Sequence, residues 1–232
     1  MKNKVYIIQT LLIAIAIFAI SGCAKDNYVA PQSILSGHVV YNGQAVGVRT
    51  NGFASGGAQL ELWQHGYAFF TKIPVYINQD GSYSALLFDG DYLLDRLSGS
   101  PWVNQTDSIA VHVKGNTVVD VPVTPFHFVS AATYTNTATT VTATITITKP
   151  NAASVLTSSS LYLGRTTLVD NKLNDAAVTI TAANITIGTP FTATVTIPAA
   201  LQTASVIYAR VGVTTVGSTE LEFSPVVAIT LH

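Results

Sequence analysis

The second half of this chain contains short segments in which apolar and polar residues alternate one by one. In residues 141–148, VTATITIT, apolar side chains alternate with threonine, and Lys149-Pro150-Asn151 follows. In an extended strand, this alternation places every apolar side chain on one face, whereas a helix of 3.6 residues per turn would scatter them. Proline cannot donate a hydrogen bond to a neighbouring strand. The pattern therefore predicts a β-strand with one buried face and one wet face, ending at the proline turn.

Similar segments recur along the rest of the chain, at residues 178–187, 191–197, 206–213 and 221–231. Their spacing is typical of a β-sandwich, and the threonine and valine that dominate them favour strands. The segments show no fixed repeat period, which argues against a tandem-repeat protein. Residues 126–232 are therefore predicted to form one β-sandwich domain.

The first half of the chain has the same character. Residues 34–41 form an apolar segment that ends at Asn42-Gly43, a dipeptide typical of tight hairpin turns. In residues 58–63, Leu60 and Leu62 fall on one face of the expected strand, and Gln59, Glu61 and Trp63 fall on the other. Further strands are expected at 73–77, between the turns at Gly81 and Gly90, and at 108–113 and 117–123.

No segment after the N-terminal region combines the apolar period of a helix with helix caps. The predicted fold class is therefore all-β, with two consecutive β-sandwich domains at residues 33–125 and 126–232. A length of 232 residues suffices for two separate cores.

The N-terminal region has the pattern of an export signal. Lys2 and Lys4 precede an apolar run over residues 5–20, and the small residues Ser21 and Gly22 follow. The run is shorter than the roughly 20 residues of a membrane-spanning helix. Residues 1–22 are therefore predicted to be a signal peptide of a lipoprotein, and residues 23–32 a lipidated tether.

Cys23 is the single cysteine of the chain. Residues 20–23, Ile-Ser-Gly-Cys, resemble a bacterial lipobox, which implies cleavage before Cys23 and acylation of its thiol. The alternative is a plain secretory signal followed by a stray cysteine. Lys25 and Asp26 are similar to the short charged tag that directs Bacteroidetes lipoproteins to the outer face of the outer membrane. The expected location is therefore the outer membrane, anchored through lipid on Cys23, with the protein facing the cell exterior.

The charge content excludes one class of partner. Charged residues make up 10% of the chain, and the net charge is −1. Because no run of like charges supplies a basic surface, we expect no nucleic-acid partner.

The sequence offers no catalytic or metal-binding constellation. Asp80, Asp89 and Asp91 are close together, but each stands beside a glycine in an expected turn, where aspartate accepts backbone hydrogen bonds. A loop calcium site is the alternative. The five histidines show neither HxH nor HExxH spacing. We therefore expect no catalytic residues, no metal and no cofactor.

Aromatic residues supply the candidate binding groups. Sugar rings stack their C–H faces on aromatic rings, while amide groups bind hydroxyl groups. The candidate glycan-binding residues are Trp102, Trp63, Tyr67, Asn104 and Gln105. Trp102 follows Gly99-Ser100-Pro101 and is the one most expected to be exposed. The alternative for both tryptophans is packing in a core.

Several motifs together resemble one family from Bacteroidetes. They are Ser36-Gly37, Asp80-Gly81-Ser82-Tyr83, Phe88-Asp89-Gly90-Asp91-Tyr92 and Val119-Asp120-Val121-Pro122. The family consists of two-domain surface lipoproteins of unknown function, usually encoded beside Sus-type polysaccharide uptake systems. The resemblance implies a prealbumin-like (transthyretin or Cna B-type) first domain and a fibronectin type III-like or immunoglobulin-like second domain.

The function expected from these observations is that of a non-enzymatic cell-surface lipoprotein that binds glycan as an accessory of a polysaccharide uptake system. The alternative is a structural or accessory subunit that packs on outer-membrane partners, such as a Sus-type transporter or binding protein, without a glycan site of its own.

Overall fold

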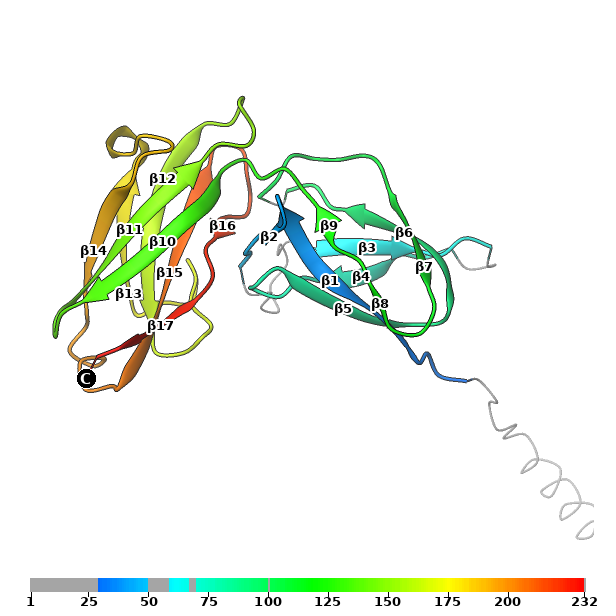
Figure 1. Cartoon of the computed structure of the whole chain (residues 1–232), viewed down its shortest axis with the longest axis horizontal. Coiled ribbons are helices and arrows are strands. Elements are labelled where there is room, and N and C mark those ends of the chain that lie inside the picture. The colour runs from blue at the N-terminus through cyan, green and yellow to red at the C-terminus, as the bar shows by residue number, and fades with distance from the viewer. Residues whose placement is uncertain (1–28, 50–58, 67–69, 100, 232) are drawn as a thin grey trace, which may run out of the picture. The chain divides into compact units, whose positions relative to one another are not determined.

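The computed structural model describes residues 29–49, 59–66, 70–99 and 101–231. Strands dominate these ranges, and their one helical element is a short 3-10 turn, η1 (Ala182–Asn184) (Figure 1). The predicted all-β class with two β-domains is confirmed. No helix in the described ranges has the length and apolarity needed to cross a lipid bilayer.

The predicted signal peptide, Cys23 and Tyr67 lie outside the described residues. Of the tether predicted at 23–32, residues 29–32 are described. The predictions on Cys23 and on the membrane anchor therefore stay predictions.

The first sandwich consists of two sheets that enclose one core. One sheet has the order β2-β1-β5, with β8 and β9 also paired to β1, and the other has the order β4-β3-β6-β7. Its strands are β1 (Ser33–Tyr41), β2 (Gln44–Ala45), β3 (Gln59–Trp63), β4 (Ile73–Tyr76), β5 (Ser82–Leu87), β6 (Gly90–Arg96), β7 (Ile109–Val113), β8 (Thr117–Val118) and β9 (Val121–Pro122).

Alternation along each strand decides which side chains enter this core. In β1, Leu35 and Val39 have no exposed surface, while Ile34 and His38 point outward. In β3, Leu60 and Leu62 are likewise fully buried. Each sheet therefore has an inner apolar face and an outer face that is free to carry other chemistry.

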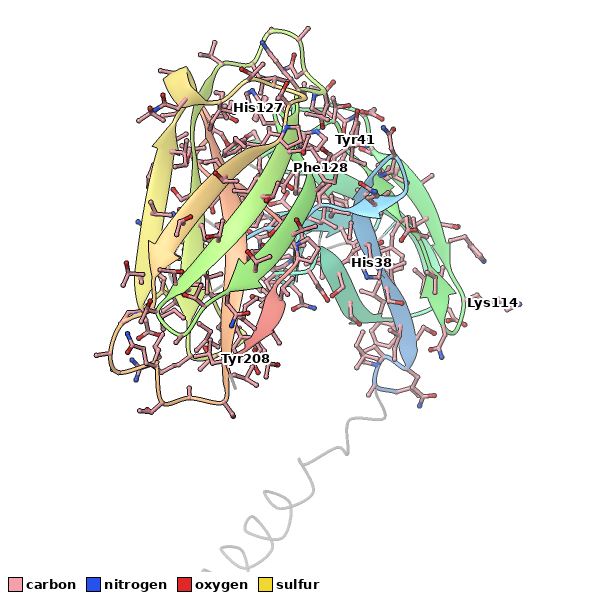
Figure 2. The ribbon with its side chains drawn as sticks, turned by 60° about the vertical axis from the view of Figure 1, so that its left-hand side comes forward. His38, Tyr41, Lys114, His127, Phe128 and Tyr208 are labelled. Carbon is pink, nitrogen blue, oxygen red and sulfur yellow. The ribbon has the colours of Figure 1, made fainter. Side chains whose placement is uncertain are left out.

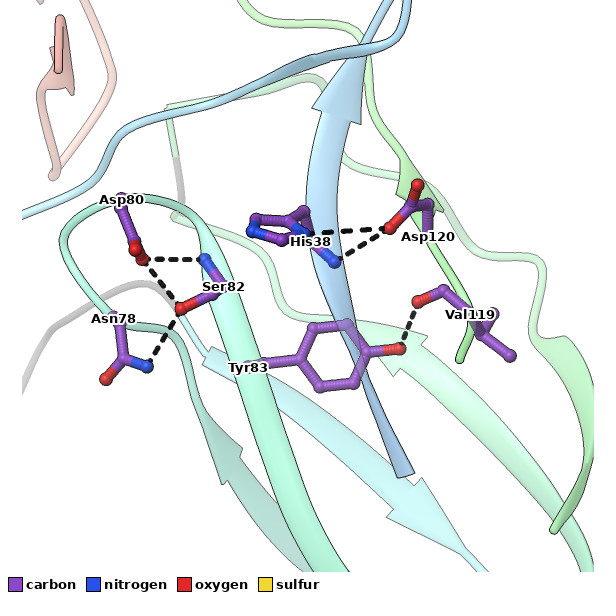
Figure 3. A network of polar contacts seen from close by, with 7 residues as sticks. All are labelled: His38, Asn78, Asp80, Ser82, Tyr83, Val119 and Asp120. Atoms are coloured by element: carbon purple, nitrogen blue, oxygen red, sulfur yellow. Dashed lines mark hydrogen bonds and ion pairs between the residues drawn. The ribbon is translucent and has the colours of Figure 1, made fainter. Parts of the chain in front are cut away.

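Two local features determine the turn at the end of β1 and the close packing of β1 against the segment at Val119. Asn42 and Gly43 have φ values of 49° and 75°, the left-handed conformation that a tight hairpin from β1 to β2 requires, so the predicted Asn-Gly turn is confirmed. At Gly37 the chain passes close to Val119, because a Cβ atom there would lie 1.8 Å from the Val119 carbonyl oxygen. The Tyr83 hydroxyl donates a 2.6 Å hydrogen bond to that same oxygen (Figure 3).

The second sandwich also consists of two sheets. Their orders are β10-β11-β14 and β13-β12-β15-β16, with β17 paired to β15. The strands are β10 (Phe128–Asn136), β11 (Thr140–Thr148), β12 (Leu156–Gly164), β13 (Ala176–Thr181), β14 (Phe191–Thr196), β15 (Val206–Thr215), β16 (Glu222–Phe223) and β17 (Val227–Thr230). In β11 the apolar residues of the alternating segment are all buried, as the sequence predicts.

The strand bounds differ from the expected ones in three places. The segment expected at 221–231 is divided into β16 and β17, because Pro225 interrupts the ladder between them. The segment at 178–187 leaves the strand after Thr181 and continues as η1. The segment at 117–123 is divided into β8 and β9, because Val119 and Asp120 leave the ladder.

The two sandwiches belong to one compact unit, Gln32–His232. Within it, the Phe223 backbone N–H donates a 3.0 Å hydrogen bond to the Gly47 carbonyl. The Arg49 guanidinium binds both carboxylate oxygens of Glu220, with an Nη2–Oε1 distance of 2.9 Å. The rings of Tyr41 and Phe128 meet edge to face with centroids 5.5 Å apart (Figure 2).

Candidate functional site

Trp102 lies inside the first sandwich. Its side chain is 2% exposed and belongs to the core between the two sheets. The expectation that Trp102 is the more exposed tryptophan is therefore wrong, and the alternative, packing in a core, is confirmed for Trp102. The physical reason is a short backbone pairing: Trp102 forms a β-bridge with Pro125, and the Val103 N–H donates to the Thr124 carbonyl. This pairing ties the segment after Pro101 to the end of the first domain and carries the indole into the core.

The residues that follow Trp102 do not build a site around its ring. Asn104 is exposed, whereas Gln105 is half-buried and its Oε1 atom is buried without a hydrogen-bond partner in the structure. Because the indole is enclosed, these two amides have no exposed aromatic surface of Trp102 beside them. Trp102, Asn104 and Gln105 are therefore not a glycan-stacking platform.

Trp63 lies on the opposite side of its sheet from the core. It directly faces Leu93 of β6 across the ladder and is half-buried. Its ring packs against that of Phe70, with centroids 5.0 Å apart and planes tilted by 34°. The His65 ring also packs against Phe70, with centroids 4.6 Å apart. Phe70 is 49% exposed, so the aromatic group is open to solvent.

The register places further outward side chains beside Trp63 in three neighbouring strands. Directly opposed residues of antiparallel strands share a face, so Gln59 shares this face with Tyr76, and Glu61 shares it with Pro74 and Asp95. Tyr76 is 62% exposed. We call the following set the Trp63 face: Gln59, Glu61, Trp63, His65, Phe70, Lys72, Pro74, Tyr76, Asp91, Leu93, Asp95, Ala110 and His112.

Two ion pairs organise the polar part of the Trp63 face. The Lys72 Nζ atom lies 2.6 Å from Glu61 Oε1, and Glu61 is buried while Lys72 is exposed. His112 Nδ1 lies 2.6 Å from Asp91 Oδ1, with both side chains exposed, as the alternation of β7 predicts for His112. The face carries three carboxylates, on Glu61, Asp91 and Asp95, against one lysine.

This arrangement suits a ligand with both apolar and hydroxyl surface. Aromatic rings offer flat faces to C–H groups, and carboxylate oxygens accept hydrogen bonds from hydroxyl groups. A surplus of carboxylates disfavours anionic ligands. Tyr76 and Lys72 were not among the candidates from the sequence, although the alternation in 73–77 would place Tyr76 on the outward face.

The aspartates of the turns have structural partners. Asp80 accepts hydrogen bonds from the backbone N–H and the hydroxyl of Ser82, at 3.0 and 2.7 Å (Figure 3). Partial burial raises the pKa of Asp80, but the Ser82 hydrogen bonds outweigh it and leave the pKa below the ordinary value. Asp89 accepts a bond from the Ser33 hydroxyl and one of 3.0 Å from the Gly115 N–H. In the described ranges, no three His, Cys, Asp or Glu residues form a group that could hold a metal ion.

A buried polar cluster lies beside β15 and β16. The Arg210 guanidinium sits 4.5 Å above the Phe223 ring, and its Nε atom donates a 2.8 Å hydrogen bond to the Ser224 carbonyl. Burial raises the pKa of Glu222 to about 8, against the lowering effects of the Val129 N–H, which donates to it at 3.1 Å, and of Arg210. Burial also lowers the pKa of His127 to about 4. These residues lie in the protein interior and do not reach the Trp63 face.

A groove of about 450 Å³ runs along β10. Its lining includes Gln44, Ala45, Tyr134 and Ser224, and the Tyr134 hydroxyl lies 3.4 Å from the Ser224 hydroxyl. Phe128 also lines the groove but is buried, and the remaining lining side chains are small or aliphatic. The groove therefore lacks the exposed aromatic pair that distinguishes the Trp63 face.

Solved structures with the same two-domain fold come from species of Bacteroides and Parabacteroides. A protein from Bacteroides ovatus is 37% identical, with a TM-score of 0.80, over 87% of this chain and 100% of its own. One from Parabacteroides merdae is 34% identical, with a TM-score of 0.78, over the same shares. Another, from Bacteroides uniformis, has 20% identity and a TM-score of 0.69, again over 87% and 100%, and its name assigns it provisionally to the carbohydrate binding proteins.

No match is found among the curated proteins. Two family models match the chain, one at residues 33–124, described as the N-terminal domain of a protein of unknown function (DUF3823), and one at residues 128–228, described as a domain of unknown function (DUF3823_C). The Bacteroides ovatus and Parabacteroides merdae proteins carry the same family name. The chain is thus a member of the two-domain DUF3823 family.

Proposed function

We propose that this protein is a non-enzymatic, glycan-binding surface lipoprotein, and that the Trp63 face holds the glycan. The observation that carries the proposal is the pair of packed, tilted rings, Trp63 and Phe70, on an open sheet face. Solvent-exposed aromatic pairs are costly on a surface that has no ligand, and they are enriched at recognition sites. The name of the Bacteroides uniformis relative, which has the same fold, points in the same direction.

The charges of the Trp63 face favour neutral polysaccharides. Asp91 and Asp95 stand on β6 beside Trp63, and the one lysine of the face is engaged by Glu61. Uronic-acid or sulfated chains would meet like charge there. Neutral sugars offer hydroxyl donors to the same carboxylates and C–H surfaces to the rings.

The proposal is for binding without catalysis. Glycoside hydrolysis needs two carboxyl groups that are both free to act on one bond. On the Trp63 face, the Glu61 carboxylate is bound to Lys72 and the Asp91 carboxylate to His112. Delivery to the cell surface through lipid on Cys23, and service to a polysaccharide uptake system, belong to the same proposal.

The test is a binding panel with residues 24–232, free of lipid, against neutral and acidic polysaccharides. Affinity electrophoresis compares the unchanged chain with Trp63→Ala and with Leu173→Ala, which removes an exposed apolar side chain from the second sandwich. We expect retardation by a neutral polysaccharide that Trp63→Ala abolishes and Leu173→Ala leaves unchanged.

Absence of binding to every polysaccharide would contradict the proposal and favour the accessory-subunit alternative. In that case, the intact lipoprotein should purify from gently solubilised membranes together with partner proteins.

A further inference from the structure

The outer face of the other sheet of the first sandwich carries three large apolar side chains in contact with solvent. Ile34, Leu86 and Val118 are 40%, 59% and 74% exposed. Ile34 directly faces Leu86 across the β1–β5 ladder, and Val118 of β8 faces Ser36, the next outward residue of β1. The three therefore form one cluster across three neighbouring strands, which we call the Ile34 patch.

This face changes character along β1. Beyond the Ile34 patch, the next rung is Ser36 opposite Ser84, and the one after it is His38 opposite Ser82. At that polar end, the His38 backbone N–H donates a 2.9 Å hydrogen bond to Asp120 (Figure 3). The apolar end is the end at which the chain enters β1. Because exposing such an apolar cluster to water is unfavourable, we expect another apolar surface to cover it.

We propose that the Ile34 patch rests on the lipid surface to which the protein is anchored. Ile34 follows Cys23 by eleven residues. A chain of that length spans at most about 40 Å. The tether therefore sets an upper limit of about that distance between the bilayer and the patch end of the sandwich. The inference rests on the proposed acylation of Cys23 and goes beyond the proposed glycan site.

The contact is apolar in nature. Lys114, in the turn before β8, is the basic residue at this end (Figure 2). The Asp89 carboxylate nearby balances it, since the Ser33 hydroxyl, the Gly115 N–H and the charge of Lys114 hold the pKa of Asp89 below its usual value. Aliphatic side chains enter the boundary between headgroups and acyl chains by burying apolar area. Salt should therefore leave the contact unchanged.

The inference links the two outer faces of the first sandwich. The Ile34 patch lies on the β2-β1-β5 sheet and the Trp63 face on the β4-β3-β6-β7 sheet, with the shared core between them. When the patch rests on lipid, the Trp63 face is turned away from the membrane. The aromatic pair is then presented to polysaccharide in the medium.

The experiment uses the full acylated chain in vesicles of phosphatidylethanolamine and phosphatidylglycerol. Because Cys23 is the single cysteine and its thiol carries lipid, one new cysteine can be labelled alone with an environment-sensitive dye. Ser84→Cys places the dye beside the Ile34 patch, and Ala110→Cys places it on the Trp63 face as the matched control. We expect doxyl-labelled lipids to quench the dye at position 84 and not at position 110.

A second variant tests the patch itself. With the dye at position 84, Leu86→Ser and Val118→Ser together should remove the quenching while the vesicles still float with the protein. Equal quenching at positions 84 and 110, or quenching that survives the double substitution, would overturn the inference. If the dye labelled Cys23 in the unchanged chain, the thiol would be free and the chain would not be anchored through it. The inference would then fail, whereas the glycan proposal has its own separate test.

Discussion

The rings of Trp63 and Phe70 lie with their centroids 5.0 Å apart on the outer face of the β4-β3-β6-β7 sheet. Trp63 comes from the end of β3, whereas Phe70 comes from the segment that leads into β4. The hairpin between two paired strands thus assembles an aromatic surface that neither strand could present alone. The carboxylates of the neighbouring β6 strand then frame it.

Phe70→Ala should weaken glycan binding without unfolding the protein. The ring is half exposed and lies outside the strands, so its removal costs little core packing. It nevertheless takes away half of the stacked pair. The expected loss corresponds to about 1–2 kcal/mol of binding free energy, which calorimetric titration would measure. A melting temperature that falls sharply in this variant would assign Phe70 to structure and not to binding.

Asp95→Lys should change which polysaccharides bind. Asp95 faces Glu61 across the ladder, and the substitution adds a second cation to the Trp63 face. We expect the unchanged chain to reject acidic polysaccharides and this variant to bind them in a salt-dependent way. Binding of the neutral polysaccharide should stay insensitive to salt. Unchanged selectivity in affinity electrophoresis would show that the carboxylates do not set the ligand class.

Gly37→Ala should destabilise the first sandwich. The added Cβ would lie 1.8 Å from the Val119 carbonyl oxygen, which also accepts the Tyr83 hydrogen bond. Because the Val119 carbonyl belongs to the backbone, it cannot swing aside as a side chain could. The segment at Val119 must therefore move away from β1. A loss of roughly 2 kcal/mol or more is expected in chemical unfolding. Gly43→Ala, a substitution in an open hairpin turn, is the comparison, since nothing lies within 4 Å of its Cβ position. Gly43→Ala therefore carries only the cost of a left-handed backbone. A smaller loss of stability in Gly37→Ala than in Gly43→Ala would refute the packing argument.

The stability of the protein should fall as the pH rises because of Glu222. Burial raises its pKa in the folded state to about 8 from an ordinary value of 4.5, so the unfolded chain releases the proton first as the pH rises. Its contribution is therefore complete below the unfolded pKa and is lost as the pH rises through the folded pKa. Glu222→Gln should remove this loss, which amounts to a few kcal/mol. The free energy of unfolding of both proteins is measured in urea at several pH values. If it changed with pH in the same way in both, Glu222 would not be the cause.

The strands with one wet face were predictable, because alternation depends only on neighbouring residues. β11 and the inward leucines of β3 follow the pattern directly. β12 has no such signal, because both of its faces are covered. Leu161 and Leu163 belong to the sandwich core, whereas Tyr162 packs in a separate cluster with Val169 and Phe223. β10 also went unpredicted, and its alternation is disturbed by the irregular register between Val129 and Ala131.

The candidate site was only partly predictable for a different reason. Trp63 could be placed on the outward face from the alternation of its own strand. The position of Trp102 depends on a backbone bridge to Pro125, more than twenty residues away, and its glycine–serine–proline approach is equally compatible with an exposed loop. The meeting of Phe70, Tyr76 and Asp95 with the Trp63 strand depends on strand order, which one sequence does not reveal.

The most direct test of the central claim uses the fluorescence of the two tryptophans. Trp63 is half-buried on the open face and Trp102 is enclosed in the core, so a neutral water-soluble quencher such as acrylamide should reach Trp63 far more than Trp102. We predict that a neutral polysaccharide bound by the protein protects Trp63 from acrylamide, and that Trp63→Phe removes most of the quenchable signal. Binding that leaves the quenching of Trp63 unchanged would contradict the assignment of the glycan to this face.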